Sequence, residues 1–225
     1  MLQSSTIKFL KDLKKNNNKP WFDAHRKEYE TAKTDFANFI QQVIDRHGKK
    51  DSSIKNLVAK DCMFRINRDV RFAKDKSPYK TNFGASINKG GRKAFSSAGY
   101  YFHLEPTHCF AGGGIWMPMP DDLKKVRQEV DYNFAEFKKI IGSKKFKSVY
   151  GDLSRDGEFV LSRVPKGYEP ANPAAEYLKL KSYIAMINIK DVDLTSKNLL
   201  KKTIEAFETL QPLLNFINES LRAPE

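Results

Sequence analysis

The centre of the chain constrains the fold most strongly, because residues 62–115 hold several short runs of β-forming residues with little sequence between them. Phe83–Ile87 and Tyr100–Leu104 are two such runs, and the turns Asn88–Gly91 and Glu105–His108 follow them. Connections this short join antiparallel neighbours, because parallel strands need a crossover of a dozen or more residues. The sequence therefore predicts an antiparallel sheet over about residues 62–117.

Helical patterns lie on both sides of this sheet-forming segment. Apolar residues recur at three- and four-residue intervals after Pro20, up to a helix end near His47 and Gly48, and the same spacing returns after Asp121 and after Thr195. Further strands are predicted near residues 158–164 and 183–189. These patterns predict an α+β fold, with N-terminal, middle and C-terminal helices flanking the sheet. We expect a single domain, residues 1–225, with a helical part (1–60), a sheet-rich centre (61–120) and an α/β part (121–225).

Positive charge is concentrated in one part of the chain. The chain has 40 Lys and Arg against 27 Asp and Glu, a net charge of +13, and residues 46–93 alone carry 14 basic and 4 acidic side chains. Such a concentration attracts an anionic partner, which can be a nucleic acid, a phosphorylated metabolite or an acidic protein.

Composition excludes several other classes. There is no run of about 18 apolar residues, so we expect no membrane-spanning helix and no membrane partner. The first residues lack the apolar core of a secretory signal, so we expect a cytoplasmic protein. Two cysteines are too few for a disulfide framework or a four-thiolate zinc site.

The densest chemistry lies in the motif between Arg65 and Lys80. We expect a strand from Phe64 to Phe72 followed by a loop over Ala73–Tyr79, because apolar and polar residues alternate and Pro78 disfavours a helix at the residue before it. The strand would direct Phe64, Ile66, Val70 and Phe72 to the core and Arg65, Asn67, Asp69 and Arg71 to the other face. Arg68 would then be an arginine on the buried side, which needs a partner.

Two interpretations of this motif remain. In the functional one, the guanidinium groups of Arg65, Arg68 and Arg71 bind a phosphate or carboxylate, with Lys76 and Lys80 as point charges. Tyr79 would donate to the anion or stack on a base, and Asp69 and Asp75 would orient the arginines or act as a catalytic base. In the structural one, Arg–Asp pairs hold the loop to the sheet. Six basic side chains against two acidic ones favour a ligand.

Weaker candidates lie further along the chain. Gly114 and Trp116 would line a pocket, although a bulge or tight bend in a strand is the favoured explanation of the glycines. His103, Glu105 and His108 could form a metal cluster, but their spacing fits no zinc signature and cross-strand pairing accounts for them, so we predict no metal. The Gly112–Gly114 run is not a phosphate-binding loop, because no Gly-Lys-Ser/Thr follows it, and the sequence leaves the cofactor unknown.

At the motif the sequence resembles the family called domain of unknown function 2461. Its pattern R-x-x-R-D-x-R-F-x-x-[D/N]-K-x-x-Y is matched at eight positions, and the resemblance extends over nearly the whole chain. The matching positions are Arg65, Arg68, Asp69, Arg71, Phe72, Asp75, Lys76 and Tyr79. The resemblance implies that the motif matters, but it implies no activity, because the family has none assigned.

The sequence therefore predicts a basic site for a phosphorylated or carboxylated small ligand, built around Arg65–Lys80. The alternative is a nucleic-acid-binding protein that uses the basic segment 46–93. Whether the protein is an enzyme is left open.

Overall fold

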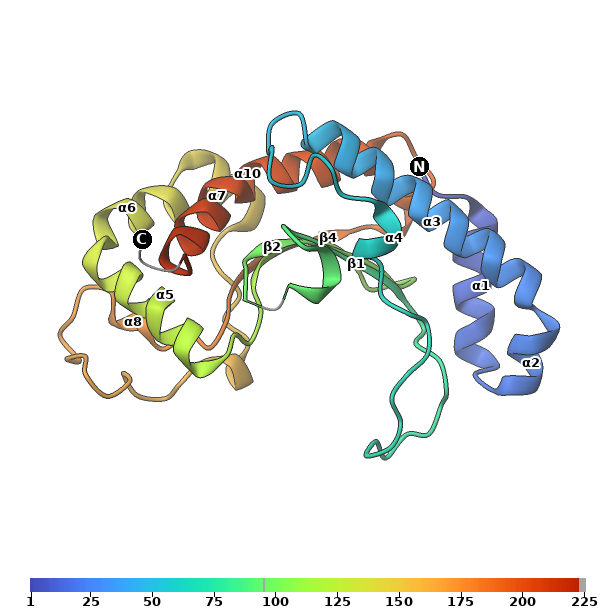
Figure 1. Cartoon of the computed structure of the whole chain (residues 1–225), viewed down its shortest axis with the longest axis horizontal. Coiled ribbons are helices and arrows are strands. Elements are labelled where there is room, and N and C mark those ends of the chain that lie inside the picture. Colours follow the sequence, from blue (N-terminus) through green and yellow to red (C-terminus); the bar gives the residue numbers. More distant parts are fainter. Residues whose placement is uncertain (95, 223–225) are drawn as a thin grey trace.

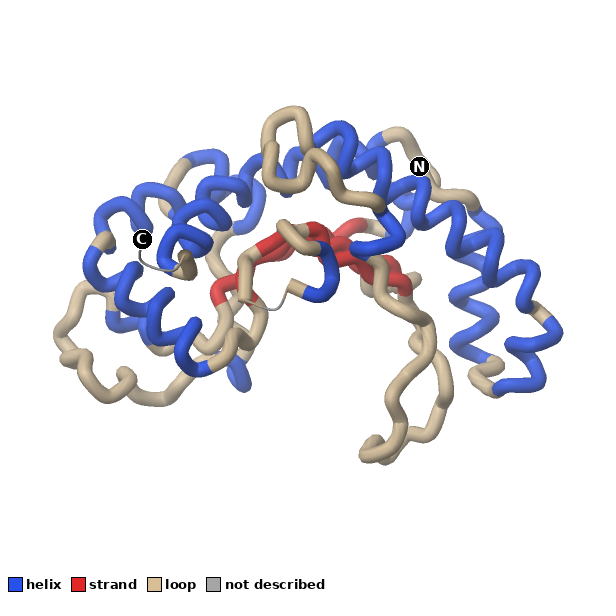
Figure 2. Tube along the Cα trace, viewed as in Figure 1, coloured by secondary structure: helices blue, strands red, loops and turns tan. Residues whose placement is uncertain are grey.

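A computed structural model describes residues 1–94 and 96–222 of the chain. Its centre is a four-stranded antiparallel sheet in which the strands lie side by side in chain order. Figure 2 shows this sheet in red beneath a layer of helices. The strands are β1 (Phe83–Ile87), β2 (Gly99–Leu104), β3 (Cys109–Ile115) and β4 (Tyr183–Ile189). The predicted α+β fold and its antiparallel sheet are confirmed.

Two long helices, α3 (Arg26–His47) and α10 (Asn198–Ser220), cover one face of the sheet (Figure 1). Alternate residues of β2 point toward them and are buried. The ring of Phe102 lies 4.9 Å from that of Phe39 in α3, and the ring of Tyr100 lies 4.7 Å from that of Phe207 in α10. The main core therefore lies between the sheet and these two helices.

Most of the remaining helices form the two ends of an arch, as Figure 1 shows. Helices α1 and α2 lie at the end that holds the N-terminus, and α5 to α8 form the opposite end. Among the described residues, no α-helix covers the second face of the sheet between these ends (Figure 2). The bounds are α1 (Ser4–Lys15), α2 (Lys19–Ala24), α4 (Ala59–Cys62), α5 (Pro120–Tyr132), α6 (Phe134–Ile141), α7 (Lys144–Tyr150), α8 (Ala175–Leu178) and α9 (Asp191–Leu194).

Two predicted helices are each divided in the structure. The helix expected after Pro20 breaks at His25, whose ring stacks on Trp21 and bonds to the Trp21 carbonyl oxygen at 2.8 Å. The middle helix breaks at Asn133, whose side-chain amide donates to Glu129 at 2.7 Å. In both places a polar side chain bonds to the preceding turn, an arrangement that competes with regular helix.

The strand predicted over Phe64–Phe72 is wrong. Residues 63–82, called the motif loop below, run from α4 to β1 as two extended legs that pair mostly with each other. The Arg68 amide donates to the Pro78 carbonyl at 2.9 Å, and the Lys80 amide donates to the Ile66 carbonyl at 2.8 Å. Ile66 is buried, but Phe72 at the far end is 96% exposed. The far end of the loop extends away from the sheet (Figure 1), so there the alternation finds no apolar surface to pack against.

The strand predicted near residues 158–164 is also wrong. A short 3₁₀ turn occupies Gly157–Phe159, and Val160 forms one isolated bridge with Leu180. A single bridge leaves this segment outside the sheet. Across the described residues, no helix has the length and apolar character needed to cross a membrane.

Candidate functional site

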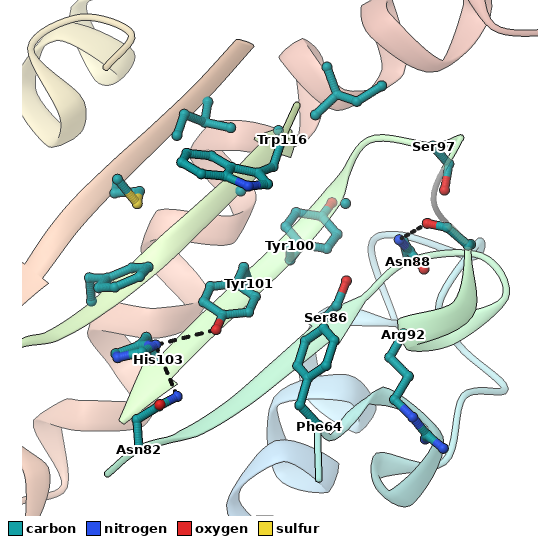
Figure 3. Close-up of a pocket in the computed structure, with 18 of the residues that line it drawn as sticks. Phe64, Asn82, Ser86, Asn88, Arg92, Ser97, Tyr100, Tyr101, His103 and Trp116 are labelled. Carbon is teal, nitrogen blue, oxygen red and sulfur yellow. Dashed lines mark hydrogen bonds between the residues drawn. The ribbon is translucent and has the colours of Figure 1, made fainter. Parts of the chain in front are cut away.

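A cavity of about 580 Å³ lies on the open face of the sheet, between the motif loop and the end of β3. Figure 3 shows this face, with Tyr101 at its centre. Five aromatic residues line the cavity together with polar groups from separate segments. The aromatic residues are Phe64, Tyr100, Tyr101, Phe110 and Trp116, and the polar ones include Lys80, Asn82, Ser86, Asn88, Arg92, Ser97, His103 and Asp156.

The hollow arises because the strands place small residues around Tyr101. On the open face Tyr101 pairs across β1 with Ser86 and across β3 with Gly112. Gly84 adds further room, since a Cβ atom there would lie 2.5 Å from the Tyr101 hydroxyl oxygen. A tyrosine ring can therefore extend over β1 with its hydroxyl inside the cavity.

His103 is the centre of a polar cluster in this cavity. Its Nδ1 lies 3.3 Å from the Tyr101 hydroxyl oxygen and 3.5 Å from the Asn82 amide nitrogen (dashed in Figure 3), and its Nε2 lies 3.5 Å from Glu105 Oε2. A carboxylate only accepts hydrogen bonds, so Nε2 carries the proton and Nδ1 is the acceptor. Burial lowers the pKa of His103 despite the opposing effect of Glu105, which favours this neutral form.

Glu105 is held from three sides. The Thr81 hydroxyl donates to Oε1 at 2.8 Å, and Lys14 Nζ of α1 lies 3.5 Å from the same oxygen. Burial acts to raise the pKa of Glu105, but the hydrogen bonds from Thr81 and His103 and the charge of Lys14 outweigh it, so the pKa is lowered. Glu105 is therefore a fixed anion behind His103.

Most charged groups of the motif bind one another in the motif loop. The Arg71 guanidinium donates two hydrogen bonds to the Asp69 carboxylate, from Nε at 3.0 Å and from Nη2 at 2.7 Å. Arg68 pairs with Asp75 and donates to the Ser77 carbonyl at 3.0 Å. Hydrogen bonds from the side chain and backbone of Ser77, followed by that from Arg68, lower the pKa of Asp75 to about 2.

Lys76 completes this internal network, since its Nζ donates to the Val70 carbonyl at 3.0 Å. Arg68, Arg71 and Lys76 therefore hold the loop in its bent form. Asp69 and Asp75, the candidate catalytic residues, are each bound to an arginine and do not line the cavity.

Arg65 and Lys80 differ from these residues, because neither forms an ion pair with any described carboxylate. They lie where the two legs of the loop meet the sheet, and Lys80 lines the cavity with its Nζ 5.4 Å from the centre of the Phe64 ring. Burial and, to a smaller extent, the charge of Arg65 lower the pKa of Lys80. Two cations without a described carboxylate partner therefore stand at the root of the loop.

Tyr79 has a packing position that the motif alone did not indicate. It is buried, and its ring stacks on Phe22 of α2 with 3.9 Å between ring centres. The side chain of Asn17 forms two hydrogen bonds to the Tyr79 backbone, donating to its carbonyl at 2.9 Å and accepting from its amide at 3.1 Å. Asn17 therefore clamps the loop to the N-terminal helices.

The other candidates are placed as follows. Gly114 and Trp116 line the cavity, and the Trp116 ring lies 4.5 Å from that of Phe159. Arg92 also lines it, although no motif singled it out; its Nη1 donates to the carbonyls of Lys60 and Asp61, both at 3.0 Å. Within residues 1–94 and 96–222, no group of three or more His, Cys, Asp or Glu side chains is arranged to hold a metal ion.

The fold and the site together define an α+β protein with a one-sided antiparallel sheet and an aromatic cavity on its open face. Residues 5–216 match the family model described as conserved hypothetical protein (DUF2461), so the chain belongs to this family. No curated protein and no solved structure matches it.

Proposed function

We propose that the cavity binds a small anionic ligand, a carboxylate or phosphate attached to a planar apolar body. The observation that carries the proposal is Lys80, a partly buried cation that lines an aromatic cavity and has no described carboxylate partner. A desolvated ammonium group without a counter-ion is costly, and a bound anion would offset that cost.

The rest of the motif supports a narrower site than the sequence predicted. Arg68 and Arg71 are engaged by Asp75 and Asp69, so the anion would bind at the root of the motif loop, to Lys80 and Arg65. Arg68 and Arg71 would affect ligand binding only indirectly, by holding the motif loop in its bent form.

The cavity walls suit the apolar part of such a ligand. A volume of about 580 Å³ lies within the roughly 300–1,000 Å³ usual for small-molecule sites. Asp156 also lines the cavity, and its backbone carbonyl accepts a hydrogen bond at 2.8 Å from the amide of Phe159, whose ring contacts Trp116. We expect the anionic group to point to Lys80 and the apolar body to lie over Tyr101 and Phe110.

Binding of phenyl phosphate, benzoate and neutral methyl benzoate tests the proposal by calorimetry. We expect phenyl phosphate or benzoate to bind the wild-type protein and Lys80→Met to weaken binding about tenfold or more, since a charge-assisted hydrogen bond contributes ~1.5–3 kcal/mol. Lys74→Met is the control, because Lys74 is an exposed lysine of the same loop without an ion pair to a described residue. Equal affinity of wild type and Lys80→Met, or equal binding of the neutral ester, would refute the proposal.

A second candidate function is binding of single-stranded nucleic acid, favoured by one specific observation. Tyr101 and Phe110 lie on adjacent central strands with 5.7 Å between ring centres, on a sheet face that no α-helix of the described part of the chain covers. Bases stack on such aromatic platforms, and Arg65, Lys80 and Arg92 would contact phosphates. Fluorescence anisotropy with labelled single-stranded oligonucleotides should show affinity that falls steeply with salt. Absence of binding at low salt would exclude this function.

We also propose a cytoplasmic location. Cys62 and Cys109 are both buried and unpaired, which fits a reducing compartment. Burial raises the pKa of each thiol to about 11, so neither cysteine is a reactive nucleophile at neutral pH.

A further inference from the structure

We infer that Tyr101, His103 and Glu105 form a proton relay that makes the Tyr101 hydroxyl a nucleophile toward an electrophilic phosphoryl or acyl centre of the bound ligand. His103 takes the proton at Nδ1, and Glu105 is the positioning residue that fixes the imidazole. The inference depends on the proposed function only for the anionic group of the substrate.

The direction of the hydrogen bonds supports the relay. Two donors, the Tyr101 hydroxyl and the Asn82 amide, converge on Nδ1, while the acceptor Glu105 faces Nε2. Glu105 and Asn82 therefore select one tautomer, the one in which Nδ1 is the acceptor, and in that tautomer the Tyr101 hydroxyl can donate to Nδ1. A nucleophile, a base and an orienting carboxylate in this order follow the general pattern for activating a hydroxyl group.

One aromatic ring and a few charged side chains surround the imidazole of His103. Phe110 stacks on the imidazole, with 4.6 Å between ring centres and an angle of 7°. The charged and titratable groups that act on it are Glu105 and, more weakly, His108, while Lys14 acts through Glu105. Nδ1 is thus the position at which the imidazole exchanges a proton with the cavity.

Tyr101 has the access that a nucleophile needs. Its hydroxyl group lies in the cavity above Gly84, and the Phe64 ring, 6.3 Å from the Tyr101 ring, also lies under Lys80. A ligand whose anionic group binds Lys80 would therefore place its next atoms near Tyr101. Burial raises the pKa of Tyr101 to about 12, so its hydroxyl needs a base to react at neutral pH.

The reaction balances without a cofactor. The Tyr101 oxygen attacks the electrophilic centre, a bond forms between them, and the bond to the leaving group breaks with its electron pair. The hydroxyl proton passes to His103 Nδ1 and then to the leaving group or to solvent.

The test uses two sulfonylating probes on the intact protein, 4-(fluorosulfonyl)benzoate and neutral benzenesulfonyl fluoride. In each case a tyrosine O–S bond forms, the S–F bond breaks and fluoride leaves. Peptide mapping by mass spectrometry gives the rate at each tyrosine. We expect Tyr101 to be labelled at least tenfold faster than Tyr132, which is 78% exposed and serves as an internal control.

Variants separate the relay from simple accessibility. We expect His103→Gln to slow labelling of Tyr101 by about 100-fold, the lower range for general-base catalysis, and to leave Tyr132 unchanged. Glu105→Gln should slow it less and move the pH at which the rate reaches half its maximum to lower values, because the imidazole loses a neighbouring anion. If His103→Gln does not fold, the comparison of Tyr101 with Tyr132 and the Glu105→Gln pH profile carry the test.

The outcomes also separate this inference from the proposed function. Labelling of Tyr101 no faster than Tyr132, or at equal rates in wild type and His103→Gln, would overturn the relay. If both probes label Tyr101 in a His103-dependent way but Lys80→Met does not slow the carboxylated probe, the relay stands and the anion site fails.

Discussion

Asn17 ties the motif loop to the N-terminal helices, and its replacement by alanine tests how strongly. The substitution removes both side-chain hydrogen bonds to the Tyr79 backbone. Each such bond contributes a net ~0.5–1.5 kcal/mol, so Asn17→Ala should lower the free energy of unfolding by about 1–3 kcal/mol. For a chain of this length, a loss of ~2 kcal/mol corresponds to a Tm lower by roughly 4–8 °C.

Urea unfolding followed by tryptophan fluorescence measures this loss, because Trp21 lies close to the clamp. The slope of unfolding free energy against urea should stay constant, since the stacking of Tyr79 on Phe22 still holds the loop. Asn16→Ala is the matched control: the Asn16 side chain forms one exposed hydrogen bond, to the Asp12 carbonyl at 2.9 Å. Equal losses of stability in Asn17→Ala and Asn16→Ala would refute the clamp.

The same variant has a functional consequence. Lys80 directly follows Tyr79, so a loosened loop also loosens the cation that we propose binds the ligand. We expect Asn17→Ala to weaken phenyl phosphate binding, and Asn16→Ala to leave it unchanged. An unaltered affinity in Asn17→Ala would mean that the position of Lys80 does not depend on the clamp.

Three further predictions concern other parts of the molecule. His47 is fully buried, both of its ring nitrogens lack a described hydrogen-bond partner, and burial lowers its pKa below 6.5. The unfolded state therefore binds the proton more tightly, and the free energy of unfolding falls as the pH drops below 6.5. His47→Phe should reduce this fall in the free energy of unfolding between about pH 8 and pH 5, as measured by urea titrations. Ser77→Ala should raise the pKa of Asp75 above its value of about 2 in carboxyl NMR titrations, because the Ser77 hydroxyl has the largest effect on it; an unchanged pKa would contradict this. Gly84→Ala should displace the Tyr101 hydroxyl and slow its sulfonylation several-fold while the fold is kept, whereas an unaltered rate would show that the ring position is not critical.

Local sequence patterns were sufficient for the sheet and the long helices. Short turns predicted the antiparallel pairing of β1, β2 and β3. The strand over Phe64–Phe72 was wrong because alternation shows only that one side of a segment is apolar. It cannot show that the segment leaves the sheet, which leaves Phe72 exposed.

The candidate site was only partly predictable for a related reason. The motif indicated the loop, but the charge ratio did not show that Arg68 and Arg71 have partners within it while Lys80 has none. The contact of Asn17 with Tyr79 joins segments far apart in the sequence. Contacts of this kind depend on the tertiary fold and leave no local signal.

The glycines of β3 have a consequence for synthesis of the protein as well as for its shape. On the ribosome β1, β2 and β3 emerge first, and residues 116–182 must follow before β4 can pair with β3. During that interval the outer edge of β3 has unpaired backbone groups that another chain could join. Gly112, Gly113 and Gly114 occupy this edge, and glycine has low β propensity and no side chain to pack. The glycine run of β3 therefore also makes the unpaired edge of β3 a poor template for aggregation while the chain is being synthesised.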